Sequence, residues 1–294
     1  MTNFYHNYTC VNNEVFVKEL SKIRNQTIPE DIILVILSYI PDSLTNKNIN
    51  YVINRYLSED KNIKTEIIER YGEINTWDVS NITNMSYLFC NAIYFNEYIN
   101  DWDVSNVTIM DGMFDGTTIF NKSLNNWNVS KVISMDSMFQ DSRYFNQSIN
   151  NWNVSNVKNM NGIFACAYSF NQPLNNWNVS NVKNMQSMFQ YALSFNQPLD
   201  NWNVSNVQNM WGMFFDSKSI NQPLNNWNVS NVKNMWGMFY KASSFNQPLD
   251  NWNVSNVTNM DDMFYKSNQI NKINKINKIN MIKKLFFNII SLFR

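Results

Sequence analysis

The sequence predicts an α/β repeat fold, in which eight strand–helix coils stack into a solenoid behind a small all-α domain. Tryptophan recurs every 25 residues without a slip, and a fixed period in this range is typical of stacked supersecondary units. A methionine follows each tryptophan by eight residues and a phenylalanine by twelve. Within each repeat the apolar spacing changes from two residues to three and four. The register tryptophans are Trp77, Trp102, Trp127, Trp152, Trp177, Trp202, Trp227 and Trp252.

The repeat at residues 170–194 illustrates the expected coil. Trp177 and Val179 enclose one polar residue, which is the apolar–polar alternation of a strand. Over residues 182–192 the apolar side chains follow steps of three and four, which predicts one helical stripe with Ser180 as its N-cap. We therefore expect strand, turn, helix and turn, with each indole buried between neighbouring coils and the recurrent asparagines in ladders that bind turn backbone.

Leu174, Trp177, Val179, Val182 and Met185 fall on the apolar positions of the pattern L-x-x-L-x-L-x-x-V-x-x-M, which resembles leucine-rich repeats and most closely their BspA-like branch. The segment FNQPLNNWNVSNVKNMQSMF is similar in sequence to the 25-residue repeats of mycoplasma surface proteins, which also occur in large DNA viruses of amoebae. The resemblance covers residues 74–270. It implies a right-handed, leucine-rich-repeat-like solenoid that binds a partner, and it does not imply an enzyme.

Composition argues against catalysis and against a resident cofactor. The formal net charge is zero, so no strong attraction to nucleic acid is expected. The chain has six glycines without phosphate-loop spacing, one histidine (His6) and three cysteines without metal-like spacing. No carboxylate pair stands out as an acid–base couple, and we read Asp78, Asp101 and Asp103 as solvated. The sequence therefore predicts no catalytic residue, no metal site, no cofactor and no nucleic-acid partner.

Cysteine usage and the N-terminal residues predict an intracellular protein. An odd, small number of cysteines indicates reduced thiols. The first twenty residues contain no apolar stretch of signal-peptide length, although the similar mycoplasma proteins are typically exported. The many Asn-x-Ser/Thr sequons then serve as structural ladders rather than as glycan sites.

The region before the repeats divides into an N-terminal arm at residues 1–25 and a helical domain at residues 26–70. The first expected helix, in residues 28–41, is apolar nearly all round and must be buried or dock onto a partner. Further on, apolar spacing predicts a second amphipathic helix over residues 49–56 and a third over residues 63–68.

Residues 28–41, IPEDIILVILSYIP, resemble the opening of an F-box. The resemblance implies docking onto the Skp-type adaptor of an SCF ubiquitin ligase. The solenoid would then hold an unknown target protein. The implied setting is a viral protein that acts in a host cell. The alternative is that these helices only cap the solenoid of a structural or adhesive repeat protein. The residues on the F-box pattern are Ile28, Pro29, Ile32, Ile36, Leu37 and Ile40.

Two positions beside the expected helical stripe, nine and thirteen residues after each tryptophan, are polar in most repeats. In repeats six and seven they hold Trp211 with Phe215 and Trp236 with Tyr240. Stacking should bring these four aromatic residues together on one side, and such clusters are enriched at protein interfaces. The alternatives are that the rings pack against each other or beneath the C-terminal tail.

The C-terminal residues 271–294 combine a low-complexity stretch with an amphipathic segment at 281–294. Fourteen residues are too few to span a bilayer. We expect a cap over the last coil, and a membrane-interface helix is the second possibility.

Overall fold

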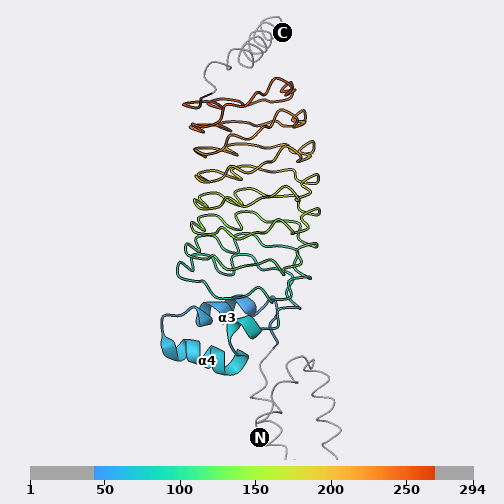
Figure 1. The fold of residues 1–294 in the computed structure, drawn as a ribbon. Coiled ribbons are helices and arrows are strands. Elements are labelled where there is room, and N and C mark those ends of the chain that lie inside the picture. Colours follow the sequence, from blue (N-terminus) through green and yellow to red (C-terminus); the bar gives the residue numbers. More distant parts are fainter. Residues whose placement is uncertain (1–42, 269–294) are drawn as a thin grey trace, which may run out of the picture.

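The computed structural model describes residues 43–268 as a stack of eight closed coils with helices at one end (Figure 1). The elements run from α3 (Ile49–Tyr56) through α4 (Lys61–Tyr71) to the 3-10 helix η1 (Ile74–Thr76). We number the coils 1 to 8 by their register tryptophans, from Trp77 to Trp252. The expected helix at 28–41, the arm and the segment 271–294 lie outside the described residues.

The prediction of an α/β solenoid of strand–helix coils is wrong. From Trp77 to the end of the described residues, the backbone forms turns, without a helix or a strand. Neighbouring coils meet instead at single parallel bridges, as between Asn159 and Asn184 and between Asn184 and Asn209. The coils are therefore stacked turns joined by inter-coil hydrogen bonds, and the strand–helix unit of leucine-rich repeats is not present in this range.

The strand expected at Trp177–Val179 does not form because the backbone turns on both sides of it. Trp177 N–H donates to the Leu174 carbonyl at 3.1 Å, and Val182 N–H donates to the Val179 carbonyl at 2.9 Å. The Asn178 side-chain oxygen accepts the Ser180 N–H at 3.1 Å. Two successive tight turns therefore occupy the stretch in which the alternating pattern predicted a strand.

The expected helix over 182–192 is replaced by turns. Some of their backbone N–H groups donate to the next coil and others donate within the same coil. Met185 N–H donates to the Asn209 carbonyl of the next coil at 2.9 Å, whereas Met188 N–H donates back to Met185 at 3.3 Å. Ser187 and Tyr191 have φ values of 51° and 55°, in the left-handed region that an α-helix excludes. Positive φ recurs ten and fourteen residues after every register tryptophan, so no coil can form this helix.

The prediction that the indoles point inward is confirmed. Trp177 is only 2% exposed, and Trp202 stacks on Trp227 with ring centroids 6.4 Å apart and planes 3° from parallel. In coils 2–8 each indole also donates a hydrogen bond to the previous coil, as Trp202 Nε1 does to the Leu174 carbonyl at 3.0 Å. The column of indoles therefore joins the coils by packing and by hydrogen bonding.

Asparagine ladders run along the stack, as the recurrent polar positions predicted. Asn171 Oδ1 accepts the backbone N–H of Asn196 in the next coil at 2.9 Å, while its own N–H donates to Asn146 Oδ1 at 2.9 Å. A second ladder uses amide donors, as Asn181 Nδ2 donates to the Ser155 carbonyl at 2.7 Å. These side chains satisfy coil backbone that no regular element pairs.

The N-terminal helices cover coil 1. The predicted apolar face of residues 49–56 is confirmed in α3, where Ile49, Val52, Ile53 and Tyr56 are all buried. Tyr56 packs edge-on against Trp77 with centroids 5.4 Å apart. Asn46 Oδ1 accepts the N–H groups of Thr83 and Asn84, which have no preceding coil. The described part of the helical region therefore covers the open face of coil 1.

Candidate protein-binding surface

One side of the stack carries the residues that vary most between repeats. We define rows 9, 13 and 14 as the residues at those distances after each register tryptophan. Rows 9 and 13 are polar through most of coils 1–5 and aromatic in coils 6 and 7. The left-handed backbone at row 14 bends the chain at the edge of this surface, as at Asp141 and Tyr191. Sequence variation is thus concentrated on a surface that the buried core does not constrain.

The structure brings the four expected aromatic residues together. Trp211 stacks on Trp236 with centroids 5.0 Å apart and planes 12° from parallel. Phe215 stacks on Tyr240 at 4.3 Å. The two stacks touch, because the Phe215 and Trp236 centroids are 6.1 Å apart. All four side chains are partly buried, so each still presents an edge to solvent.

Two tyrosines that were not predicted as site residues extend these stacks. Tyr265 stacks on Tyr240 at 4.9 Å, and Tyr191 meets Phe215 edge-on at 5.6 Å. Tyr265 lies in row 13 and could have been found by counting, whereas Tyr191 lies in row 14, which shows no aromatic pattern. We call the six residues the ring cluster: Tyr191, Trp211, Phe215, Trp236, Tyr240 and Tyr265.

Lysines lie over the rings at the C-terminal end of the cluster. Lys241 Nζ is 5.3 Å from the Tyr240 ring centroid, and Lys266 Nζ is 5.4 Å from that of Tyr265. These distances are within the range of cation–π contacts. This end of the ring cluster therefore already holds two cations of its own chain.

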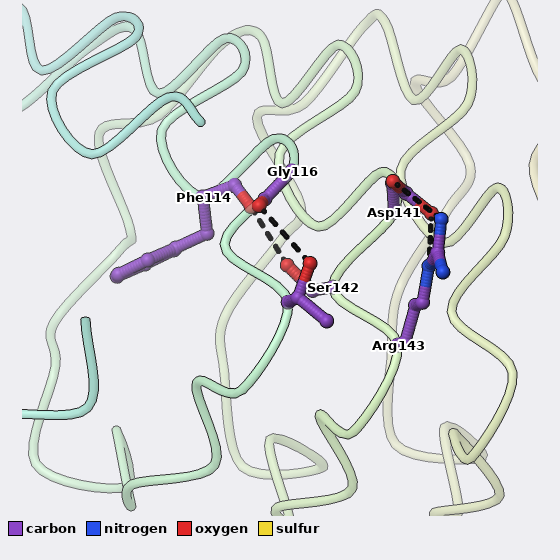
Figure 2. A network of polar contacts seen from close by, with 6 residues as sticks. Phe114, Gly116, Asp141, Ser142 and Arg143 are labelled. Carbon is purple, nitrogen blue, oxygen red and sulfur yellow. Dashed lines mark hydrogen bonds and ion pairs between the residues drawn. The ribbon is translucent and has the colours of Figure 1, made fainter. Parts of the chain in front are cut away.

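The same side is hollowed at coils 1–5. This acidic hollow, about 600 Å³ in volume, is lined by Asp115, Asp141, Arg143 and Tyr191 among others. Arg143 forms a two-pronged ion pair with Asp141, at 2.9 and 3.3 Å, and Figure 2 shows the two side chains facing each other. In the same view Ser142 turns inward, and its hydroxyl donates to the Phe114 carbonyl of the previous coil at 2.7 Å.

No cation within residues 43–268 is seen to pair with the second carboxylate of the acidic hollow, Asp115. Burial raises the pKa of Asp115, and the negative charge of Asp141 raises it further, while a hydrogen bond from Gln140 opposes both effects. Burial likewise raises the pKa of the Cys166 thiol, which disfavours the reactive thiolate. The hollow is thus a polar, net negative recess beside the rings, without an activated nucleophile.

The remaining predicted residues can be placed briefly. The six F-box-like residues, from Ile28 to Ile40, lie outside the described range. Asp78 and Asp103 are turn caps rather than merely solvated, since each accepts a serine N–H at 3.0 Å. The hydrogen bonds from Ser105 hold the pKa of Asp103 below its usual value.

Two searches of the described residues bear on metal and membrane binding. Within residues 43–268 no three His, Cys, Asp or Glu side chains are arranged to hold a metal ion. In that same range no helix has the length and apolar character needed to cross a bilayer.

Comparison with known proteins gives one family. The family described as "Mycoplasma protein of unknown function, DUF285" matches the chain twice, over residues 60–177 and 164–279. Together the matches span about three quarters of the chain and include all eight coils. No curated protein and no solved structure gave a match.

Proposed function

The chain belongs to the DUF285 repeat family, and we propose that it is a non-enzymatic protein-binding adaptor that contacts its partner through the ring cluster. The observation that carries this proposal is the gathering of six aromatic side chains from coils 5–8 on one surface. Aromatic residues with exposed edges are typical of the energetic centres of protein interfaces.

The ring cluster is not needed for the coils to stack. Coils 2–5 stack with Asp115, Gln140, Ala165 and Gln190 at the positions that Phe215 occupies in coil 6. The core beneath is complete without the cluster, since phenylalanines such as Phe189 and Phe214 are fully buried. The rings do pack against each other, yet Tyr265 remains 45% exposed. Packing alone therefore leaves apolar edges that a partner could cover.

A double variant tests the adaptor role. The full-length Trp211→Ala/Trp236→Ala protein should recover its partners from a eukaryotic lysate at less than a tenth of the wild-type amount, as measured by quantitative mass spectrometry. Tyr51→Ala is the matched control, because Tyr51 is 63% exposed on α3, away from the cluster. Equal recovery by a double variant with an unchanged unfolding midpoint would contradict the proposal.

The finer form of this proposal is a substrate-recognition subunit of an SCF-type ubiquitin ligase. It rests on the F-box-like sequence of residues 28–41. Such an adaptor acts by proximity, holding a target beside the ligase without chemistry of its own. Recovery of a Skp-type protein and a cullin, lost with Ile32→Asp or Leu37→Asp, would support this form. A folded wild-type protein that recovers neither would refute it.

A structural or adhesive repeat protein is the second candidate. The observation that favours it is the cap, because Tyr56 of α3 contacts Trp77 and Asn46 pairs with the first coil. Under this proposal the helices only close the stack, and neither the ring-cluster variant nor the helix variants change the proteins that are recovered.

A further inference from the structure

The ring cluster and the acidic hollow form one continuous surface. Tyr191 lines the hollow and also meets Phe215 of the cluster, with centroids 5.6 Å apart. The same rows supply both parts, since Asp115 and Phe215 both stand thirteen residues after their register tryptophans. A partner bound at the rings therefore reaches the hollow by continuing along the stack.

The acidic hollow holds a carboxylate that its own lining does not neutralise. Asp115 and Asp141 line the acidic hollow, and among its described lining residues Arg143 is the only cation. Arg143 is already paired with Asp141 at 2.9 Å, so none of the described lining residues gives Asp115 a positive partner. Row 9 adds Asp111 and Asp136 in the same coils. At the other end Lys241 and Lys266 lie over the rings, and row 9 holds the exposed Asp261, so charges of both signs surround that end.

These observations rest on the proposed binding function and specify the chemistry of the partner. We propose that the surface binds an extended segment of a partner protein whose basic side chain enters the acidic hollow beside Asp115 and whose aromatic side chain packs on the ring cluster. The segment lies along the stack axis, because the hollow and the cluster follow each other in that direction. The places of Asp115 and of the rings fix its orientation, with the basic residue toward coil 2.

The coil spacing sets the distance between the two anchors. Coils joined by parallel bridges are about 4.8 Å apart, so the four-coil step from Asp115 to Phe215 is about 19 Å. An extended chain rises about 3.3 Å per residue. The basic and the aromatic residue of the partner should therefore be about six positions apart.

Selection from a random library of 12-residue peptides displayed on phage tests this inference with the full chain as bait. The enriched peptides should carry Arg or Lys about six positions from Trp, Tyr or Phe. In fluorescence anisotropy, Asp115→Asn should weaken the best peptide at least tenfold. Arg143→Ser should strengthen it, because the substitution frees Asp141 for the peptide. Asp200→Asn, which removes an exposed carboxylate elsewhere, should change nothing.

The outcomes separate this inference from the adaptor proposal. The selected peptides could require Trp236 for binding, carry no basic residue and bind equally well to Asp115→Asn. That result would refute the proposed basic residue of the partner and would leave the ring cluster as the binding surface. Peptides that bind equally well to Trp211→Ala/Trp236→Ala would overturn both. A selection that enriches no peptide would overturn the extended-segment inference, while the lysate experiment still decides the adaptor role.

Discussion

The indole Nε1 of Trp177 donates a hydrogen bond to the carbonyl oxygen of Ile149, 28 residues upstream, at 3.0 Å. The same carbonyl accepts the Trp152 N–H at 3.1 Å within its own coil. The equivalent bond recurs in every later coil, as from Trp252 to Leu224 at 2.8 Å. Each tryptophan therefore contributes a hydrogen bond between coils as well as buried apolar volume. A leucine at this position could contribute only the apolar volume.

Trp177→Phe separates these two contributions. The phenyl ring keeps part of the packing but loses the donor, so we expect the free energy of unfolding to fall by about 1–3 kcal/mol. Trp177→Ala should cost about 3–5 kcal/mol, because a cavity replaces the ring. Urea unfolding followed by circular dichroism measures both. Lys183→Ala is the control, since Lys183 is exposed. Equal losses for the Phe and Ala variants would mean that the hydrogen bond dominates.

Asn171→Ala tests the outer ladder. Asn171 Oδ1 accepts the Asn196 N–H at 2.9 Å and the Gln197 amide at 3.1 Å, and alanine leaves both donors without this acceptor. We expect a loss of about 1 kcal/mol in the free energy of unfolding. Asn171→Asp keeps an acceptor in the same place and should lose less than half as much. The ladder would be unimportant if both variants unfolded at the wild-type urea midpoint.

The left-handed backbone predicts substitution effects of opposite sign to those of a helix. Gly212 has φ of 56°, and a Cβ there would make only ordinary contacts at 3.6 and 3.7 Å. Gly212→Ala should therefore destabilise by about 1–2 kcal/mol through backbone strain alone. Ser187→Gly, at the equivalent position of the previous coil, should leave stability unchanged or raised, because it relieves the same strain.

In a helix the result would be reversed, since alanine exceeds glycine in helix propensity by about 1 kcal/mol. Urea unfolding of the two variants beside wild type gives the sign directly. A stabilised Gly212→Ala protein would restore the helical interpretation of this stretch.

The 25-residue period predicted correctly which side chains face inward and which meet between coils. It did not predict the secondary structure within a coil, because that depends on the backbone conformation. Inward indoles and the meeting of Trp211 with Trp236 follow from counting, whatever the coil is made of. The apolar steps over residues 182–192 suit a helix equally well as turns that bury the same side chains. A signal was present, because Gly112, Gly162, Gly212 and Gly237 all occupy one position of the expected helix, where glycine is unfavourable.

The acidic hollow could not be found from spacing. Asp115 and Asp141 belong to different rows of adjacent coils, and only the backbone turn at row 14 brings them to one recess. Tyr191 was missed for the same reason, since its row holds residues as different as Gly116, Cys166 and Lys241. Where neighbouring positions vary in type, the sequence alone does not show which of them share a surface.

The carboxyl group of Asp115 predicts a dependence of stability on pH. Burial, reinforced by Asp141, raises its pKa in the folded state, so the native protein binds this proton more tightly than the unfolded chain does. The group's contribution to stability is therefore most favourable below the unfolded pKa and is lost as pH rises toward the folded pKa. Asp115→Asn, which removes the charge, should unfold at a higher urea concentration than wild type at pH 7, and this advantage should shrink on acidification.

Asp115→Asn thus allows the effect on stability and the effect on peptide binding to be measured in the same variant. Because the substitution should strengthen the fold while weakening a basic peptide, loss of binding cannot be attributed to unfolding. Urea midpoints at several pH values from 3 to 7 provide the measurement, with Asp200→Asn as the exposed control expected to follow wild type. A variant less stable than wild type at pH 7 would show that Asp115 is favourably paired when charged, and the acidic hollow would then have no carboxylate free for a partner.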